Sequence, residues 1–134
     1  MVLLSNRRLG PAAELLVSPP VAAAALRAVA AAGRPAAEAR WEHELVHWLE
    51  GVAAACGGRA PAGLDVADIA WTPEHFERQR AFVLAAIAAA GAGLAPQGPE
   101  ARALAGWASL IAAHPRESVS VGRRWRWPDS LATA

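Results

Sequence analysis

Two histidines and a glutamate lie within five positions near the middle of the chain, in the run His43-Glu44-Leu45-Val46-His47. Residues four apart on a helix lie one turn apart on the same face, so both imidazoles could reach one ion. The carboxylate of Glu44 could then take a proton from a water bound to that ion. On a helix, this run would carry the side chains of a zinc-dependent hydrolase.

The spacing matches the His-Glu-x-x-His pattern, and the flanking residues resemble the longer signature of the zincin metallopeptidases. The uncharged residues that fit this signature are Trp41, Leu45, Val46, Trp48 and Leu49. Arg40 departs from it, because that place is usually a small or β-branched residue, and Glu50 stands where the metzincin extension has a glycine. The resemblance implies a zinc cofactor held by His43 and His47, with Glu44 as the catalytic base.

A third zinc ligand would have to come from another part of the chain. The segment expected to form the next helix offers Glu77 and His75, and we prefer Glu77. That helix can lie antiparallel to the one that carries the histidines. Helical spacing puts His43 and His47 nearly opposite the apolar stripe of their own helix, which fits a cleft or an ordinary solvated surface equally well.

Length and composition predict one folded domain over residues 1–134. The chain has 134 residues, of which 54% are hydrophobic, and this excludes an intrinsically disordered protein. Its net charge of +1 argues against a dedicated nucleic-acid binder, which is usually more basic. All 13 basic residues are arginine, and together with the heavy use of alanine this indicates a bacterial genome of high GC content.

The cysteine content and the short apolar runs predict a cytoplasmic protein without a membrane segment. Cys56 is the only cysteine, so no internal disulfide can form, and its place on an apolar helix face predicts a buried thiol. The apolar run 2–4 is too short for a signal peptide. The uncharged run 81–98 contains glycines and a proline, and its apolar part is shorter than the roughly 20 residues of a membrane helix.

Proline and glycine positions predict a mainly α fold, a compact bundle of about four helices. The expected helices cover about 19–32, 35–56, 73–91 and 99–113. The apolar runs 2–4 and 15–17 predict a small hairpin, although residues 12–14 could equally begin a helix. Strict alternation over 118–127 predicts a strand. The minor strand or hairpin element would thus come from the N- and C-terminal segments.

The alternation of arginine and tryptophan over 123–127 could grip phosphates and stack on bases. With a net charge near zero, we favour a strand whose tryptophans pack on the bundle. The segment from Asp65 to Trp71 could form an acidic recognition loop. We favour the interpretation that it leads into a helix, with Thr72 as the N-cap.

The number of tryptophans favours a binding role over a catalytic one. Six tryptophans exceed what a modest core requires, and tryptophan is enriched at the energetic centres of interfaces. Our leading hypothesis is therefore a small cytosolic helical protein, non-catalytic, that binds a protein partner or a second copy as an accessory, regulatory or immunity-type subunit. The predicted contact residues are Trp71, Trp125, Trp127, Arg124 and Arg126. The alternative is the zinc-dependent hydrolase.

Overall fold

The computed structural model describes residues 1–57 and 63–116, and in this part the mainly α fold is confirmed. The helices are α1 (Pro19–Gly33), α2 (Arg40–Gly57), α3 (Phe76–Ala92) and α4 (Pro99–Ala112). Three short 3-10 turns cover Arg7–Leu9, Arg34–Ala36 and Val66–Asp68. The predicted strand 118–127, which includes Arg124, Trp125, Arg126 and Trp127, lies outside the described residues.

Helix α1 is the centre of the bundle, since it contacts α2, α3 and α4. Pro19 occupies the first turn of this helix, as the sequence predicted, and Ser18 precedes it in an extended conformation without a side-chain cap hydrogen bond. The face of α1 that enters the core is built largely from alanine, as at Ala22, Ala25 and Ala30. These small side chains let three neighbouring helices pack against the same short segment.

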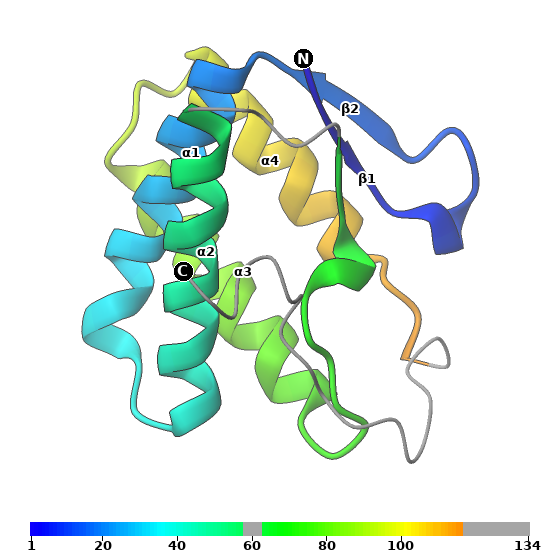
Figure 1. Ribbon diagram of the computed structural model, residues 1–134, viewed down its shortest axis with the longest axis vertical. Helices are drawn as coiled ribbons and strands as arrows, with labels where there is room; N and C mark the ends of the chain where they lie inside the picture. Colours follow the sequence, from blue (N-terminus) through cyan, green and yellow to red (C-terminus); the bar gives the residue numbers. More distant parts are fainter. Residues whose placement is uncertain (58–62, 117–134) are drawn as a thin grey trace.

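A small sheet lies along one side of the bundle, next to α4, with α1 and α2 on the opposite side (Figure 1). Its strands are β1 (Val2–Ser5), β2 (Glu14–Val17) and β3 (Gly63–Asp65). Strand β1 is central, antiparallel to β2 and parallel to β3. The expected N-terminal hairpin is therefore confirmed, and its alternate residues Val2, Leu4 and Val17 are buried.

Three large aromatic side chains lie in the centre of the core. Trp48, Phe76 and Trp107 are almost fully buried, whereas Trp41 and Phe82 are only partly buried. Cys56 is buried too, and this desolvation raises the pKa of its thiol, so the thiolate is disfavoured.

The predicted start of the second helix was wrong, because Pro35 lies in a separate 3-10 turn and α2 begins at Arg40. The carboxylate of Glu42 folds back and accepts hydrogen bonds from the backbone N–H groups of Glu38 and Ala39, at 3.0 and 2.6 Å. This contact satisfies donors at the helix start, where no earlier carbonyl can reach them.

Helix α3 also begins later than predicted, at Phe76. Thr72 was expected to cap it, but the Thr72 N–H instead donates to the side-chain oxygen of Gln79 at 3.0 Å. The amide nitrogen of Gln79 donates to the carbonyl of Ala70 at 2.9 Å. The side chain of Gln79, on the first turn of α3, thus holds the segment that precedes the helix by two hydrogen bonds.

None of the described helices combines the length and the apolar character that crossing a membrane requires.

Candidate functional site

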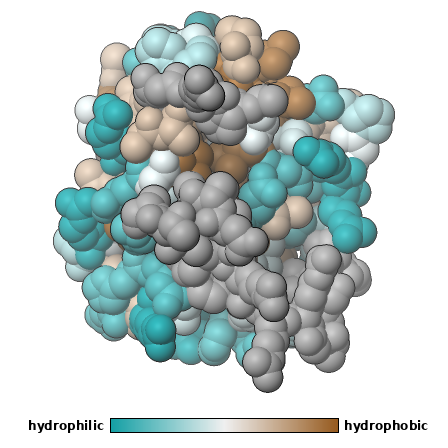
Figure 2. Space-filling view, viewed as in Figure 1, coloured by the Kyte–Doolittle hydropathy of each residue, from teal (hydrophilic) through white to brown (hydrophobic). Residues whose placement is uncertain are grey.

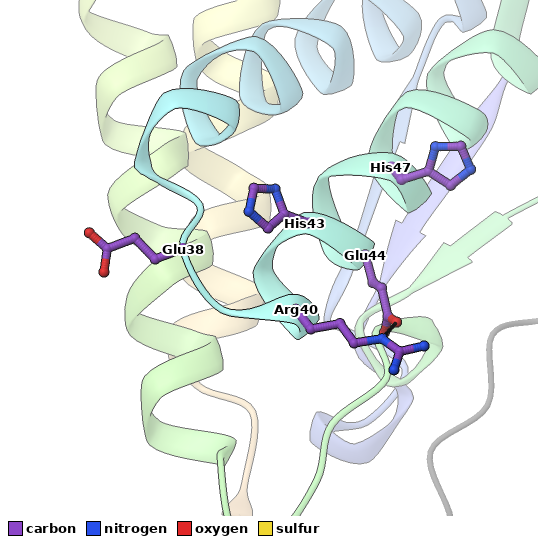
Figure 3. Close-up of a pocket in the computed structure, with 5 residues that line it drawn as sticks. All are labelled: Glu38, Arg40, His43, Glu44 and His47. Atoms are coloured by element: carbon purple, nitrogen blue, oxygen red, sulfur yellow. Dashed lines mark hydrogen bonds and ion pairs between the residues drawn. The ribbon is translucent and has the colours of Figure 1, made fainter.

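The two histidines of the zincin-like pattern lie on the solvent face of α2, as helical spacing predicted, and both are exposed. Their rings turn away from each other (Figure 3). Glu44 is turned toward Arg40, whose Nε lies 2.9 Å from its carboxylate oxygen Oε1. The pattern therefore forms on one helix face, but its three side chains do not converge on one point.

The predicted third ligand does not complete a metal site. The Glu77 carboxylate accepts a hydrogen bond from Arg80 at 2.8 Å, and the alternative ligand His75 stacks on Trp41 with ring centroids 6.3 Å apart. Over residues 1–57 and 63–116, no three His, Cys, Asp or Glu side chains gather in a way that could hold a metal ion. The donor groups in this part of the chain do not fit a zinc centre.

The surface around the histidines is a hollow with polar walls, lined by Glu38, Arg40, His43, Glu44 and His47 (Figure 3). Four of these five side chains belong to the first two turns of α2. All five side chains end in an ionisable group, and no hydrophobic residue of the described part of the chain lines this hollow.

A second hollow lies between the start of α2 and the first half of α3, and its chemistry differs. Its lining residues are Glu38, Ala39, Trp41, Glu42, Arg78, Ala81 and Phe82. The two rings, Trp41 and Phe82, pack edge to face at a centroid distance of 5.8 Å and an interplanar angle of 78°. Both are partly exposed, so this hollow has an aromatic floor that water reaches.

Charges of both signs surround this aromatic floor. Glu38 and Arg78 are exposed, whereas the Glu42 carboxylate is held by the backbone at the start of α2. His75 also packs against Trp41, and their rings are nearly parallel, at an interplanar angle of 17°. Gly33 also lies close by, since a Cβ there would sit 3.6 Å from the Phe82 ring.

Asp65 is the centre of a buried hydrogen-bond network at the end of the sheet. Its carboxylate accepts from the Ser5 hydroxyl at 2.8 Å and from the N–H groups of Arg7 and Ala67, each at 2.9 Å. Burial raises the pKa of this carboxyl, but these hydrogen bonds and the charge of Arg7 outweigh it and leave the pKa below its usual value. With Asp68 bonding back to the Asp65 N–H, the pair forms a capping box rather than an acidic recognition surface.

Trp71, predicted as a contact residue, lies in the core with only 9% of its surface exposed. Its indole N–H donates to the Val66 carbonyl at 2.9 Å, and its ring stacks on His114 at 5.5 Å. This position leaves it little surface for a partner. The sequence did not reveal the hollow at Trp41, because Trp41 belongs to the apolar stripe of α2. The signal that could have revealed it is the position of Trp41 in the first turn of that helix, where a side chain is less fully covered.

Comparison with protein-family models, curated proteins and solved structures finds no match for this chain.

Proposed function

We propose that this chain is a small, non-catalytic cytoplasmic protein that binds another protein, as an accessory, regulatory or immunity-type subunit. The proposed contact surface is the hollow of Trp41 and Phe82 between α2 and α3. The observation that carries the proposal is the pair of partly exposed aromatic rings on its floor.

Aromatic side chains in a hollow are typical of the residues that dominate binding energy. Trp48, Trp71 and Trp107 are buried, so of the tryptophans in the described part of the chain, Trp41 is the one with substantial surface left to cover. A partner side chain placed over Trp41 would remove that indole from water, and such contacts can each contribute about 2 kcal/mol or more. His75 already fixes the ring, so little side-chain entropy would be lost on binding.

The charges around the floor support a polar rim of the kind that surrounds an interface core. Glu38 could pair with a basic residue of the partner and Arg78 with an acidic one. We therefore expect a partner segment with an apolar side chain flanked by charges of both signs. Such pairs mainly set orientation and association rate.

The zinc-dependent hydrolase has less support, because His43 and His47 are exposed, point apart and gather no third ligand among the described residues. It remains the alternative that a metal-binding assay tests directly.

Introducing a large charged side chain into the hollow tests the binding proposal. Ala81 is exposed and lines the hollow, whereas Ala105 is exposed on α4 and does not line it. We expect proteins captured from native cells by the wild type to include one that Ala81→Arg loses and Ala105→Arg keeps. With that protein purified, Trp41→Ala should weaken the Kd by about tenfold or more. Equal capture by both arginine variants would contradict the proposal.

A further inference from the structure

The outer edge of β2 is open in the described part of the chain. The strand order is β2-β1-β3, so β2 has a neighbour on one side only. Such edges carry unpaired backbone donors and acceptors and are templates for pairing with another chain. Long or hydrophobic edges are usually protected by charged residues or by proline, yet here the centre of the strand is Leu15-Leu16.

Exposed hydrophobic side chains concentrate on this hairpin. The large hydrophobic residues that are exposed in the described part are Met1, Leu9 and Leu16. Met1 directly precedes β1, Leu9 lies between β1 and β2, and Leu16 belongs to β2. Figure 2 shows hydrophobic surface at the top of the molecule, where the hairpin lies. Leu16 is 63% exposed at the centre of the edge strand.

The register of the hairpin identifies which backbone groups face outward. The Asn6 N–H donates to the Ala13 carbonyl, and bonded and non-bonded pairs alternate along an antiparallel ladder. Leu15 and Val17 therefore bond to β1, whereas the N–H and C=O of Leu16 and Glu14 point away from it. Leu16 thus offers both its side chain and its backbone to a partner strand.

We propose that two copies of this chain pair through β2, antiparallel, about a two-fold axis that passes beside Leu16. Leu16 then lies opposite Leu16 of the second copy, and each donates its N–H to the other's carbonyl. In the same register, Leu15 lies opposite Val17 of the second copy. The two sheets join into one continuous sheet across the dimer.

The strand is complementary to itself in this arrangement. Leu16 and its symmetry mate form an apolar pair on the outer face. Leu15 and Val17 extend the inner layer, where Leu15 already lies against α4, its Cδ2 only 2.7 Å from where a Cβ on Gly106 would be. Such aligned pairs are the units that stabilise a sheet.

Charge also selects the antiparallel pairing. Glu14 is the only charged residue of β2 and stands at its first position. Antiparallel pairing places the two Glu14 side chains at opposite ends of the ribbon, whereas parallel pairing would place them side by side and make them repel. A second copy therefore fits this edge better than a parallel strand of the same composition.

The test is sedimentation velocity over a concentration series with matched charge variants. Leu16→Lys puts a charge at the proposed axis, and Leu9→Lys puts the same charge on an exposed residue of the hairpin that lies outside the strand. We expect the wild type and Leu9→Lys to dimerise alike and Leu16→Lys to weaken the dimer at least tenfold. A wild type that stays monomeric at every concentration, or equal dimers in both variants, would overturn the proposal.

Cysteine cross-linking gives a readout that does not depend on how well Leu16→Lys folds. Opposed residues of a bonded antiparallel pair have Cα atoms about 5.5 Å apart, within the range a disulfide spans. Leu16→Cys should therefore form a covalent dimer on mild oxidation, much faster than Leu9→Cys. Equal rates would indicate random collision, and pairing of β2 with another protein's strand would leave the purified Leu16→Cys chain without a cross-link. Either result rejects the homodimer.

Discussion

Asn6 and His114 are 108 positions apart in the sequence, yet Oδ1 of Asn6 lies 3.4 Å from Nδ1 of His114 inside the core. The side-chain nitrogen of Asn6 donates to the Leu110 carbonyl at 2.9 Å. Arg80 donates to the carbonyl of His114 at 3.2 Å. These contacts join the end of β1, the end of α4 and the first half of α3 at one place.

Burial makes His114 a source of acid sensitivity. Desolvation lowers its pKa, the nearby charges of Arg8 and Arg80 lower it further, and the charge of Asp65 opposes them. The unfolded chain therefore binds a proton on this histidine at a higher pH than the folded chain does. Stability is lost as the pH falls below about 6.5, the unfolded pKa, and the loss is complete below the folded pKa.

Urea unfolding of the wild type and His114→Gln at about pH 7.5 and about pH 5.5 measures this effect. The wild type should lose more stability on acidification than the variant. Asp65 does not contribute in this window, because its pKa is lowered and its stabilisation is lost only as the pH falls below about 3.8. Equal losses in both proteins would show that His114 is not the group responsible.

Removing the Asp65 carboxylate should be among the most destabilising polar substitutions. Asp65→Ala leaves the Ser5 hydroxyl and the N–H groups of Arg7 and Ala67 without their acceptor, and we expect a cost of about 3 kcal/mol. Asp68→Ala removes one bond from an exposed carboxylate and should cost about 1 kcal/mol. Chemical unfolding of both variants gives the comparison, and similar costs would argue against the central role of Asp65.

The Gln79 side chain should matter for the start of α3. Gln79→Ala frees the Thr72 N–H and the Ala70 carbonyl from their partner, and we expect a loss of about 2 kcal/mol. Gln97→Ala, at an exposed glutamine in the turn before α4, should change stability by less than about 0.5 kcal/mol. Hydrogen exchange should show faster opening of the first turn of α3 in Gln79→Ala only, and unchanged exchange there would contradict this role.

Zinc should leave the stability of the protein unchanged, because His43 and His47 point apart and gather no third ligand in the described part of the chain. Differential scanning calorimetry with and without added zinc should give the same Tm for the wild type and for His43→Ala. A rise in Tm with zinc that disappears in His43→Ala would restore the hydrolase hypothesis, and Glu44→Gln would then test the catalytic base.

Local signals were enough to predict most of the fold. Proline at the start of α1 and glycine at its end predicted the bounds of that helix within a residue or so, and the short apolar runs predicted the hairpin. Strand β3 was not predicted. Its three residues are held by β1, a partner distant in sequence, and such pairings leave little trace in local composition.

The candidate site could be predicted only in part. Spacing correctly placed His43 and His47 on the outer face of α2, because that depends on helix geometry alone. Whether two rings converge depends on side-chain rotamers and on what faces them, and spacing does not give either. The ion pair of Arg40 with Glu44, in contrast, follows the i,i+4 spacing of opposite charges on a helix. The hollow at Trp41 arises where α2 and α3 meet, so neither helix reveals it alone.

The place of β1 has a consequence for how the chain matures during synthesis. Its neighbour β3 is made about 60 residues later, since Ser5 and Asp65 are 60 positions apart, and Leu110, which bonds to Asn6, is 104 positions later. Strand β1 can therefore pair early with β2 alone, and its pairing with β3 must wait until residues 63–65 have been made. The buried positions of Val2 and Leu4 are therefore completed only when segments far along the chain have joined the hairpin.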